Sequence, residues 1–298
     1  MIKIAVILTC YNRRELTLSC LRTLFSVADI YNKKREYEAV SLSVYLTDDG
    51  CTDGTGEAVR SAFPEYDITI MQGNGNLYWA GGMRLAWGEA IKKEWDYYLL
   101  LNDDTDLLPN LFDELFSTMR YSREKFGKEG LVSGLTSAKD DHDKTTYGGG
   151  VRFKKTRQHN ASLSPGEPRR VDFTNANILL VHHTVVDKLG IFYEGFRHGN
   201  ADFDYALHAV RAGFPVLITV NYCGRCNRDH DAFEKYRDKI LSMDLQQRKT
   251  FLNHPIRSSK DYLTCIRRNA PLRYPLVAFG RWLNLYAPKL YYWLYSKR

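Results

Sequence analysis

The first half of the sequence alternates short, strand-like apolar runs with segments whose apolar residues recur at helical spacing. Strands are expected at residues 3–9, 39–47, 68–72, 97–102 and 172–181, and helices at 14–27, 57–63, 81–94 and 201–212. Strands that alternate with helices pair in parallel through right-handed crossovers. The sequence therefore predicts an α/β fold, with a mostly parallel central sheet flanked by helices. Such sheets bind ligands beyond the carboxyl ends of their strands.

The pattern changes twice further along the chain. Residues 140–168 are polar and contain GGG and SPGEP, which favours a long loop or a hairpin. After Tyr222 the alternation stops, and the chain becomes basic, aromatic and helical. We therefore expect an α/β domain over residues 1–225 and a helical C-terminal extension over residues 226–298.

The positive charge is concentrated in that extension. The whole chain of 298 residues carries a net charge of +7, and residues 255–298 hold nine Lys or Arg against one acid, Asp261. The rest of the chain is therefore close to neutral. This distribution argues against a nucleic-acid-binding domain and favours a local anionic partner for the extension.

The six cysteines are dispersed and do not form the framework of a disulfide-rich domain, so a cytosolic location is expected. Cys223 and Cys226 form one C-x-x-C pair, with His230 four residues further on. A structural zinc site needs four ligands, which would require His230 and His254 as well. Zinc therefore remains an alternative for this pair.

Acidic residues follow the fourth expected strand, in the segment LLLNDDTD. Asp103, Asp104 and Asp106 lie within four residues and repel one another unless a cation or another donor lies among them. Mg²⁺ and Mn²⁺ prefer such oxygen ligands and leave coordination positions open for phosphates. The alternative is helix capping, which we favour for Asp106 because Pro109 indicates a helix start.

Two further segments combine glycines with polar side chains. TDDGCTDGT follows the second expected strand, and it suits either a ligand-binding turn or an ordinary turn with helix caps. GNGNLYWAGG opens a helix, where glycines permit close backbone approach and an anion is favoured. It lacks the GK[ST] of a phosphate-binding P-loop, and no G-x-G-x-x-G follows the first strand.

In this order, the motifs VILTCYNRRELTLSCLRTL, DDGCTDGT, NGNLYWAGGMRLAW and LLLNDDT resemble those of the family 2 glycosyltransferases. These are inverting, nucleotide-sugar-dependent enzymes of the GT-A fold that include rhamnosyltransferases. A fifth segment, HGNADFDYALHAVRAG, is similar to the family's F-x-E-D-x-D-x-x-x-R-x-x-x-A-G, with Ala201 replacing the Glu and His208 the Arg. The resemblance covers roughly residues 1–225.

The resemblance implies roles for particular residues in binding the donor. Asp49 would accept a hydrogen bond from the N3–H of uracil or thymine, and Asp103 would hold the ribose or the donor sugar. Asp104 would ligate Mn²⁺ or Mg²⁺, and His230 or Asn227 would complete the metal or pyrophosphate site. The other residues expected at the nucleotide are Thr9, Tyr11, Asn12, Asn76, Gly81 and Gly82.

The resemblance also places Asp202 at the position of the catalytic base. Asp202 and Asp204 would lie on different faces of one helix, about 200° apart. One of them can therefore face a ligand while the other pairs within the protein. An ordinary role as acids in a first helical turn is the alternative for both. Asn175 and Asp204 are expected near the acceptor.

Residues 274–295 have an unusual aromatic content. Apolar side chains recur at helical spacing along Leu276, Phe279, Leu283, Tyr286, Leu290 and Trp293. Arg281 and Lys289 fall roughly opposite, and Pro288 is expected to kink or split the helix. A basic amphipathic helix of this kind suits an anionic membrane surface, and packing against protein is the alternative.

The sequence therefore predicts a cytoplasmic, metal-dependent inverting glycosyltransferase that is peripheral on the inner face of the cell membrane. Its donor would be a UDP- or dTDP-sugar, and its acceptor a saccharide, lipid-linked, in cell-surface polysaccharide biosynthesis. No nucleic acid partner is expected. A nucleotidyltransferase acting on sugar phosphates and a non-catalytic carbohydrate- or nucleotide-binding protein remain as alternatives.

Overall fold

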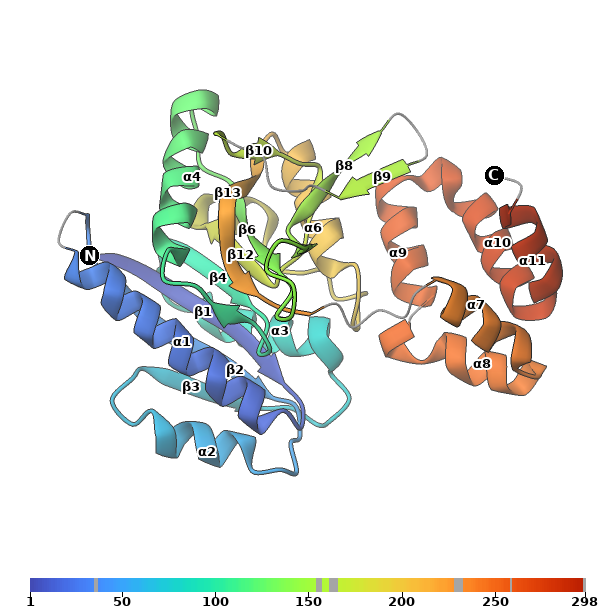
Figure 1. Cartoon of the computed structure of the whole chain (residues 1–298), viewed down its shortest axis with the longest axis horizontal. Coiled ribbons are helices and arrows are strands. Elements are labelled where there is room, and N and C mark those ends of the chain that lie inside the picture. The colour runs from blue at the N-terminus through green and yellow to red at the C-terminus, as the bar shows by residue number, and fades with distance from the viewer. Residues whose placement is uncertain (35–36, 154–156, 161–165, 228–232, 258, 297–298) are drawn as a thin grey trace.

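The computed structural model describes residues 1–34, 37–153, 157–160, 166–227, 233–257 and 259–296 (Figure 1). Its strands are β1 (Ile2–Cys10), β2 (Val40–Asp48), β3 (Ile68–Gln72), β4 (Tyr97–Leu101), β5 (Asp106–Leu107), β6 (Leu131–Ser137), β7 (Thr145–Tyr147), β8 (Gly149–Phe153), β9 (Arg157–Asn160), β10 (Arg169–Arg170), β11 (Phe173–Thr174), β12 (Ile178–His182) and β13 (Val216–Arg225). Its α-helices are α1 (Arg14–Lys33), α2 (Thr55–Ala62), α3 (Tyr78–Ala90), α4 (Leu111–Phe126), α5 (His183–Leu189), α6 (Ala201–Arg211), α7 (Phe233–Ser242), α8 (Leu245–Asn253), α9 (Ser259–Asn269), α10 (Tyr274–Tyr286) and α11 (Pro288–Ser296).

The central sheet has the strand order β10-β13-β6-β12-β4-β1-β2-β3. Strands β4, β1, β2 and β3 are parallel to one another, and β13 is parallel to β6. Between these two parallel groups lies β12, which runs antiparallel to both β4 and β6. The short strands β5, β7 and β10 are also antiparallel to their neighbours. The predicted mostly parallel α/β sheet is confirmed. The carboxyl ends of β1, β2 and β4, with their polar residues, therefore meet at one edge.

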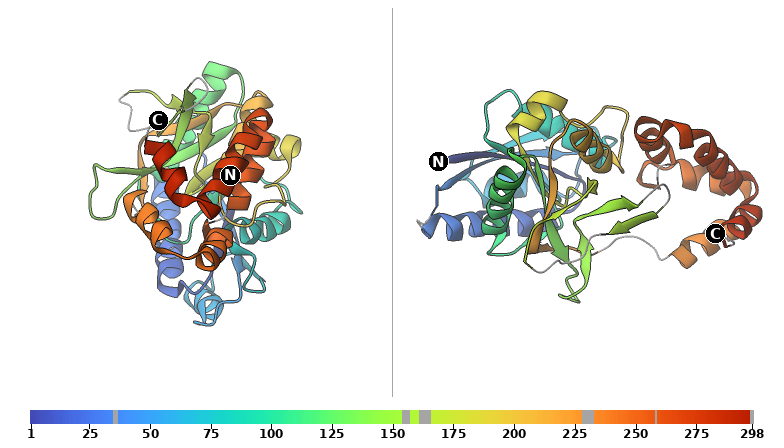
Figure 2. Two further views of the ribbon diagram at one scale, coloured as in Figure 1. Left: turned by 90° about the vertical axis from the view of Figure 1, so that its right-hand side faces the viewer. Right: turned by 90° about the horizontal axis from the view of Figure 1, so that it is seen from above.

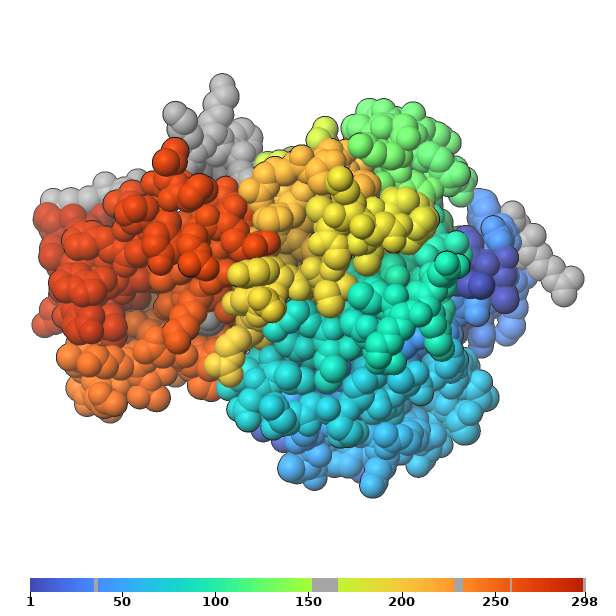
Figure 3. Space-filling view, turned by 180° about the vertical axis from the view of Figure 1, so that it is seen from behind, coloured from blue at the N-terminus to red at the C-terminus, as the bar shows by residue number. Residues whose placement is uncertain are grey.

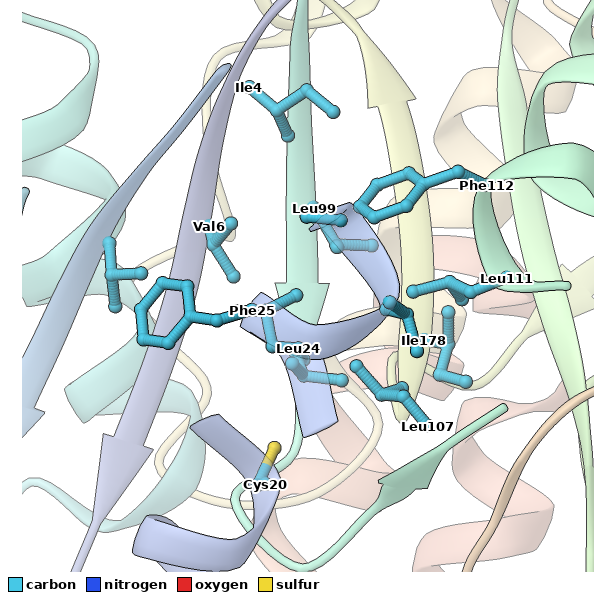
Figure 4. Packing of buried hydrophobic residues seen from close by; sticks show 14 of the residues in the cluster. Ile4, Val6, Cys20, Leu24, Phe25, Leu99, Leu107, Leu111, Phe112 and Ile178 are labelled. Atoms are coloured by element: carbon cyan, nitrogen blue, oxygen red, sulfur yellow. The ribbon is translucent and has the colours of Figure 1, made fainter. Parts of the chain in front are cut away.

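Helices cover both faces of this sheet. On one face, Phe25 of α1 and Phe112 of α4 pack on Val6 and Leu99, which point out of β1 and β4 (Figure 4). On the other face, α3, α5 and α6 pack around the fully buried Trp87. β-strands with both faces buried are apolar at successive positions, which explains the continuous apolar runs of the sequence.

The prediction of a single strand over residues 172–181 is wrong. The chain forms β11, leaves the strand at residues 175–177, and then forms β12. β11 pairs with β8 in a second, three-stranded sheet, whereas β12 belongs to the central one. The polar segment before them contains the antiparallel pair β8 and β9, so the hairpin expected there is present.

The C-terminal helices form a lobe beside the α/β body (Figure 2). Within this lobe α10 packs against α8, α9 and α11. The chain is split between α10 and α11 at Ala287, immediately before Pro288, as expected from the proline. The view from behind shows the lobe in contact with the body near residues 190–210 (Figure 3). None of the described helices combines the length and apolarity needed to span a membrane.

The aromatic stripe expected along residues 276–293 is wrong as one continuous face. Leu283 is 7% exposed and points into the lobe, whereas Phe279 and Trp293 are 55% and 53% exposed. The two helices fold against each other, so positions in α10 and α11 no longer lie on one line. Periodicity across a proline therefore overestimated the length of the stripe.

Candidate active site

The Asp49 carboxylate organises the glycine-rich loop at the carboxyl edge of the sheet. It follows β2 and is 3% exposed. Its Oδ1 accepts a hydrogen bond from the Gly75 N–H at 2.9 Å, and its Oδ2 accepts from the N–H groups of Leu77 and Tyr78 at 3.0 and 3.1 Å. The carboxylate therefore caps the start of α3, which is the ordinary structural role considered for this turn. Its contact with a uracil or thymine base remains a prediction.

Gly82 lets α3 lie directly on the sheet. A Cβ at this position would be 2.0 Å from the Thr9 Oγ1. The Thr47 hydroxyl donates to the Gly82 carbonyl at 2.8 Å, and the N–H of Gly81 donates to the Arg197 carbonyl at 3.3 Å. The small residues of GNGNLYWAGG therefore bring α3 close to β1, β2 and the loop before α6.

The segment after β1 is joined to the turn after β2. Asn12 has a positive φ of 50°, its side-chain Oδ1 accepts from the Thr52 N–H at 2.7 Å, and its own N–H lies 3.2 Å from the Cys51 Sγ. The neighbouring Tyr11 side chain is 55% exposed. Asn76 is also exposed. Tyr11 and Asn76 are therefore accessible to solvent, whereas Asn12 is held by its hydrogen bond with Thr52.

Asp103 and Asp104 follow β4 and share one cation, the guanidinium of Arg13. The Arg13 Nη1 lies 3.2 Å from the Asp103 Oδ1 and 2.9 Å from the Asp104 Oδ2. The Thr17 hydroxyl donates to the other oxygen of Asp103 at 3.3 Å. Burial raises the pKa of Asp103 to about 6, an effect that Arg13 opposes and Asp104 increases. The predicted repulsion between Asp103 and Asp104 is thus relieved by Arg13, which immediately precedes α1.

The end of β13 reaches the same acids through Cys226. The Cys226 thiol donates to the Asp104 Oδ1 at 3.5 Å, and it lies 3.6 Å from the Asn177 Nδ2. Cys223 is fully buried and lies beside Thr219 instead. Over the described part of the chain, no group of three or more His, Cys, Asp or Glu side chains is arranged to hold a metal. A zinc site at the C-x-x-C pair therefore has no support among these residues, and His230 lies outside them.

Asp106 was expected to cap α4, and this prediction is wrong. Its carboxylate pairs with the Lys139 Nζ at 2.9 Å, and Asn110 is the residue that precedes the helix. Asp106 is in β5, which pairs with β13, so its backbone is already used in the sheet. Proximity to Pro109 in the sequence was a misleading signal.

The donor set at Asp103 and Asp104 fits a hard divalent cation. In many proteins Mg²⁺ is held by one or two carboxylates together with substrate phosphates, without a complete protein cage. The bridging guanidinium shows that two carboxylate oxygens from the pair converge on a single positive centre. Asp104 is the more accessible of the two, because its side chain is 17% exposed against 7% for Asp103.

Asp202 lies in the first turn of α6 and is partly buried. Its Oδ1 accepts from the Phe203 N–H at 2.9 Å, and its Oδ2 from the Ala176 N–H at 3.3 Å. Burial raises its pKa to about 6, against the effect of these backbone N–H groups. Ala201, which replaces the family's Glu, is 1% exposed, so desolvation and not a second carboxylate accounts for the increase.

The turn over residues 175–177 connects Asp202 with the acidic pair. Ala176 contacts Asp202, while Asn177 contacts Cys226 and accepts through its carbonyl from the Asn102 N–H at 3.1 Å. Asn175 lies in the same turn and is partly buried. The break in the expected strand therefore places Asn175 and Asp202 at the same edge of the sheet as Asp103 and Asp104.

Asp204 has a different environment from Asp202. It is 3% exposed, both its oxygens accept from the Arg268 Nε at 3.0 and 3.1 Å, and Oδ1 accepts from the Asn269 Nδ2 at 2.6 Å. Arg268 and Asn269 belong to α9. Asp204 therefore fastens the C-terminal lobe to α6.

A second fastening comes from Asp261 of α9, which is 2% exposed. Its carboxylate accepts from the N–H groups of Arg197, His198 and Gly199 at 3.2, 2.8 and 3.0 Å. This loop leads directly into the helix that carries Asp202. Sequence reasoning missed Asp261, although a single acid in a strongly basic segment was a visible signal.

Two other residues of the site were also missed. Arg13 follows the TCYN segment directly, and a basic residue so close to that motif could have been paired with the acids. Trp79 donates from its Nε1 to the Asn102 Oδ1 at 2.8 Å and so links α3 with the end of β4. Nothing in the sequence distinguished this tryptophan from an ordinary core residue.

No protein-family model matches the sequence, and no curated protein sequence does so at a significant level. Solved structures do match the fold. One is a mannosyltransferase, PcManGT from Pyrobaculum calidifontis, in complex with GDP-Man and Mn²⁺; it has 15% sequence identity and a TM-score of 0.52, over 96% of this chain and 81% of that one. Another is TarS 1–349 of S. aureus, with 12% identity and a TM-score of 0.58, over 95% and 88% of the two chains.

A third match is GalNAc-T7 with UDP, GalNAc and Mn²⁺, at 15% identity and a TM-score of 0.54. It covers 76% of this chain and 43% of the larger enzyme. At these sequence identities, all three similarities establish architecture alone. The chain has the GT-A fold, the fold of these glycosyltransferases.

Proposed function

We propose that the protein is an inverting glycosyltransferase that uses a nucleotide-diphosphate sugar as its donor. The proposal rests on one observation. At the carboxyl edge of a GT-A sheet, the turn at residues 175–177 connects Asp202, a single partly buried aspartate, with the acidic pair Asp103–Asp104. Inverting transfer needs one carboxylate as base and a cationic centre at the leaving diphosphate. Asp202 would be the base, and the pair Asp103–Asp104 would hold the metal ion that provides the cationic centre.

The chain's own residues would then act as follows. Tyr11 and the loop held by Asp49 bind the base and ribose, and Asp103 holds the ribose or the sugar. Asp104, with Asp103, would hold Mn²⁺ or Mg²⁺, which when bound neutralises charge on the donor's diphosphate. Asp202 accepts the proton of the acceptor hydroxyl as that oxygen attacks the anomeric carbon, while the bond from this carbon to the diphosphate breaks. His230 remains a proposed additional metal ligand.

The ligands of the similar structures support this class of donor. PcManGT was solved with GDP-Man and Mn²⁺, and TarS 1–349 with UDP-GlcNAc. For this chain we propose a UDP- or dTDP-sugar, on the strength of Asp49 as a partner for the N3–H of uracil or thymine. Asn175, next to Ala176 and Asp202, is proposed to contact the acceptor.

We also propose a lipid-linked saccharide as the acceptor, in cell-surface polysaccharide assembly on the cytoplasmic face of the membrane. Its support is the outer surface of α10, where Leu276, Phe279 and Trp282 are 61%, 55% and 53% exposed. Exposed apolar patches of this kind mark interaction sites, and Arg281 and Lys289 lie close by in the sequence. Aromatic and basic side chains together bind anionic lipid surfaces.

Replacing Phe279 and Trp282 by serine should reduce sedimentation with anionic liposomes at least tenfold. Burying each of these side chains in the interface would contribute about 1.5–3 kcal/mol. The double variant keeps Leu283 and the rest of the lobe's interior. A deletion of α10 and α11 would instead remove Tyr292 and expose Ile240 and Leu252, which pack in the same cluster. Binding of the wild type should weaken at high salt, because salt screens the basic charges.

The matched control replaces Ile30 and Ile91, which are 38% and 43% exposed on α1 and just after α3, by serine. It should sediment like the wild type. Equal loss in both double variants, or retention in the α10 variant, would contradict the membrane proposal and favour a protein partner for this surface.

The donor proposal is tested by measuring thermal stability with UDP, dTDP, GDP and the corresponding nucleoside triphosphates, each with and without Mn²⁺. One of these nucleotides should stabilise the protein in the presence of the metal, by about 2.7 kcal/mol at a hundredfold excess over its dissociation constant. Stabilisation by nucleoside triphosphates alone would favour a nucleotidyltransferase. Stabilisation without any turnover of donor sugars would favour a non-catalytic binding protein.

A further inference from the structure

Arg13 occupies the place between Asp103 and Asp104 where a cation is needed. One nitrogen, Nη1, serves both carboxylates, at 3.2 and 2.9 Å. Asp103 is almost completely buried, so its charge is poorly solvated and depends on this partner. The guanidinium and a divalent ion would therefore use the same oxygen atoms, and both cannot do so at once.

We propose that Arg13 is an internal competitor of the metal, which makes metal binding depend on the donor's diphosphate. In the metal-free state Arg13 neutralises the acidic pair. A divalent ion that binds the pair displaces the guanidinium, and the displaced side chain then needs another anion. The diphosphate of the donor is such an anion, since arginine pairs with phosphate oxygens through its planar fork.

The surroundings of Arg13 are suited to this exchange. The residue immediately precedes α1, and its side chain is 41% exposed, so it can leave the pair without unpacking the core. Asp104 keeps a second contact through the Cys226 thiol, and Asp103 keeps the Thr17 hydroxyl. The acidic pair therefore stays in place while its cationic partner changes.

This mechanism predicts positive coupling between the metal and the diphosphate. Each ligand removes the obstacle to the other: the metal releases Arg13, and the diphosphate stabilises the released side chain. By linkage, the factor by which the diphosphate raises metal affinity equals the factor by which the metal raises diphosphate affinity. Couplings of this kind typically amount to about 5–150-fold.

The test measures Mn²⁺ binding to the full-length protein at pH 8, by electron paramagnetic resonance of free Mn²⁺. The measurement is made with Mn²⁺ alone and with Mn²⁺ plus UDP or dTDP, whichever stabilises the wild type. In Arg13→Gln, affinity for Mn²⁺ alone should rise about tenfold, as expected for removal of a charge-assisted competitor. The effect of the nucleoside diphosphate on Mn²⁺ affinity should fall at least fivefold.

Two variants separate this competition from general changes in charge or folding. Arg14→Gln removes the same charge one residue further on, where the side chain lies near Glu15 at 3.8 Å, and it should change neither quantity more than about twofold. Arg13→Lys keeps a positive charge in the same place and should retain most of the coupling. Recovery by lysine would also show that a loss in Arg13→Gln does not come from misfolding.

The inference rests on the proposed function, and the outcomes distinguish the two. If the wild type binds Mn²⁺ and the diphosphate cooperatively but Arg13→Gln leaves Mn²⁺ affinity and coupling unchanged, the competition is overturned and the proposed function stands. If no nucleoside diphosphate binds to the wild type with Mn²⁺, the proposed function fails and the inference fails with it. Equal changes in Arg13→Gln and Arg14→Gln would also overturn it.

Discussion

Asp202→Asn is expected to slow sugar transfer by roughly two to four orders of magnitude, which is the usual contribution of a positioned general base. The amide has nearly the same size but cannot accept the acceptor's proton. The Asp202 carboxylate accepts from the backbone of Ala176 and Phe203, whereas Asp103 and Asp104 pair with Arg13. Affinity for the nucleoside diphosphate should therefore stay within about threefold of the wild type. Initial rates of transfer and calorimetric titration with the diphosphate measure these two quantities.

The pH profile supplies a second signature of the same residue. Because burial raises the pKa of Asp202 to about 6, its basic form predominates above that pH, and wild-type transfer should fall as the pH drops below 6. Ionisation of Asp202 should increase activity but decrease stability, because a carboxyl group whose pKa is raised in the folded state destabilises the protein when it is ionised. Asp202→Asn should therefore be as stable as the wild type at pH 7.5, or more so.

The control for this prediction is Asp187→Asn, which changes an exposed carboxylate on α5 and should leave transfer unaffected. Asp204→Asn is unsuitable as a silent control. It would weaken the pair with Arg268 and is expected to lower thermal stability. Full transfer activity in Asp202→Asn, at a rate independent of pH between 5 and 7, would contradict the assignment of the base.

Asp104→Ala should abolish Mn²⁺-dependent donor binding, lowering the affinity at least a hundredfold, while the fold is retained. An open-site metal ligand is lost, and the side chain removed is partly exposed, so no core packing is lost with it. Arg13 keeps Asp103 as its partner, which leaves the buried charge neutralised. Calorimetric titration with the nucleoside diphosphate and Mn²⁺ measures the loss.

Asp106→Ala is the matched control for that variant. Asp106 lies two residues further on, but it pairs with Lys139 outside the acidic pair, and its replacement should change donor affinity less than about threefold. Unchanged Mn²⁺-dependent affinity in Asp104→Ala would contradict the proposed metal site, whatever the result for Asp106.

Much of the central sheet could be predicted because its strands are locally distinct. The runs that became β1, β2, β3 and β4 are short and mainly apolar, with β-branched residues in the first three and YYLLL in β4. The run at residues 172–181 has the same composition, but its first part pairs with β8 and its second with β4 and β6. A local pattern contains no information about which neighbour a strand pairs with, nor in which direction.

The candidate site likewise contains some residues that could be predicted from the sequence and others that could not. Asp103, Asp104 and Asp49 could be located because polar residues at the ends of parallel strands converge at one edge. Asp261 stands out in the sequence as the single acid of a basic segment, but its partners could not be predicted. They are the N–H groups of Arg197, His198 and Gly199, which are more than sixty residues earlier in the chain. The direction of Leu283 was mistaken for a similar reason: helical spacing identifies a face, and only the partner helices decide whether that face is covered.

The stereochemistry of donor cleavage tests the central claim most directly. The full-length protein is incubated with Mn²⁺ and the nucleotide-sugar that it binds, and the sugar released at early times is followed by proton NMR. The account predicts that an α-linked donor first yields the β-anomer, at a rate that requires both Asp104 and Asp202. Release of the α-anomer first, or equal rates in the wild type and Asp202→Asn, would contradict single-displacement transfer with Asp202 as its base.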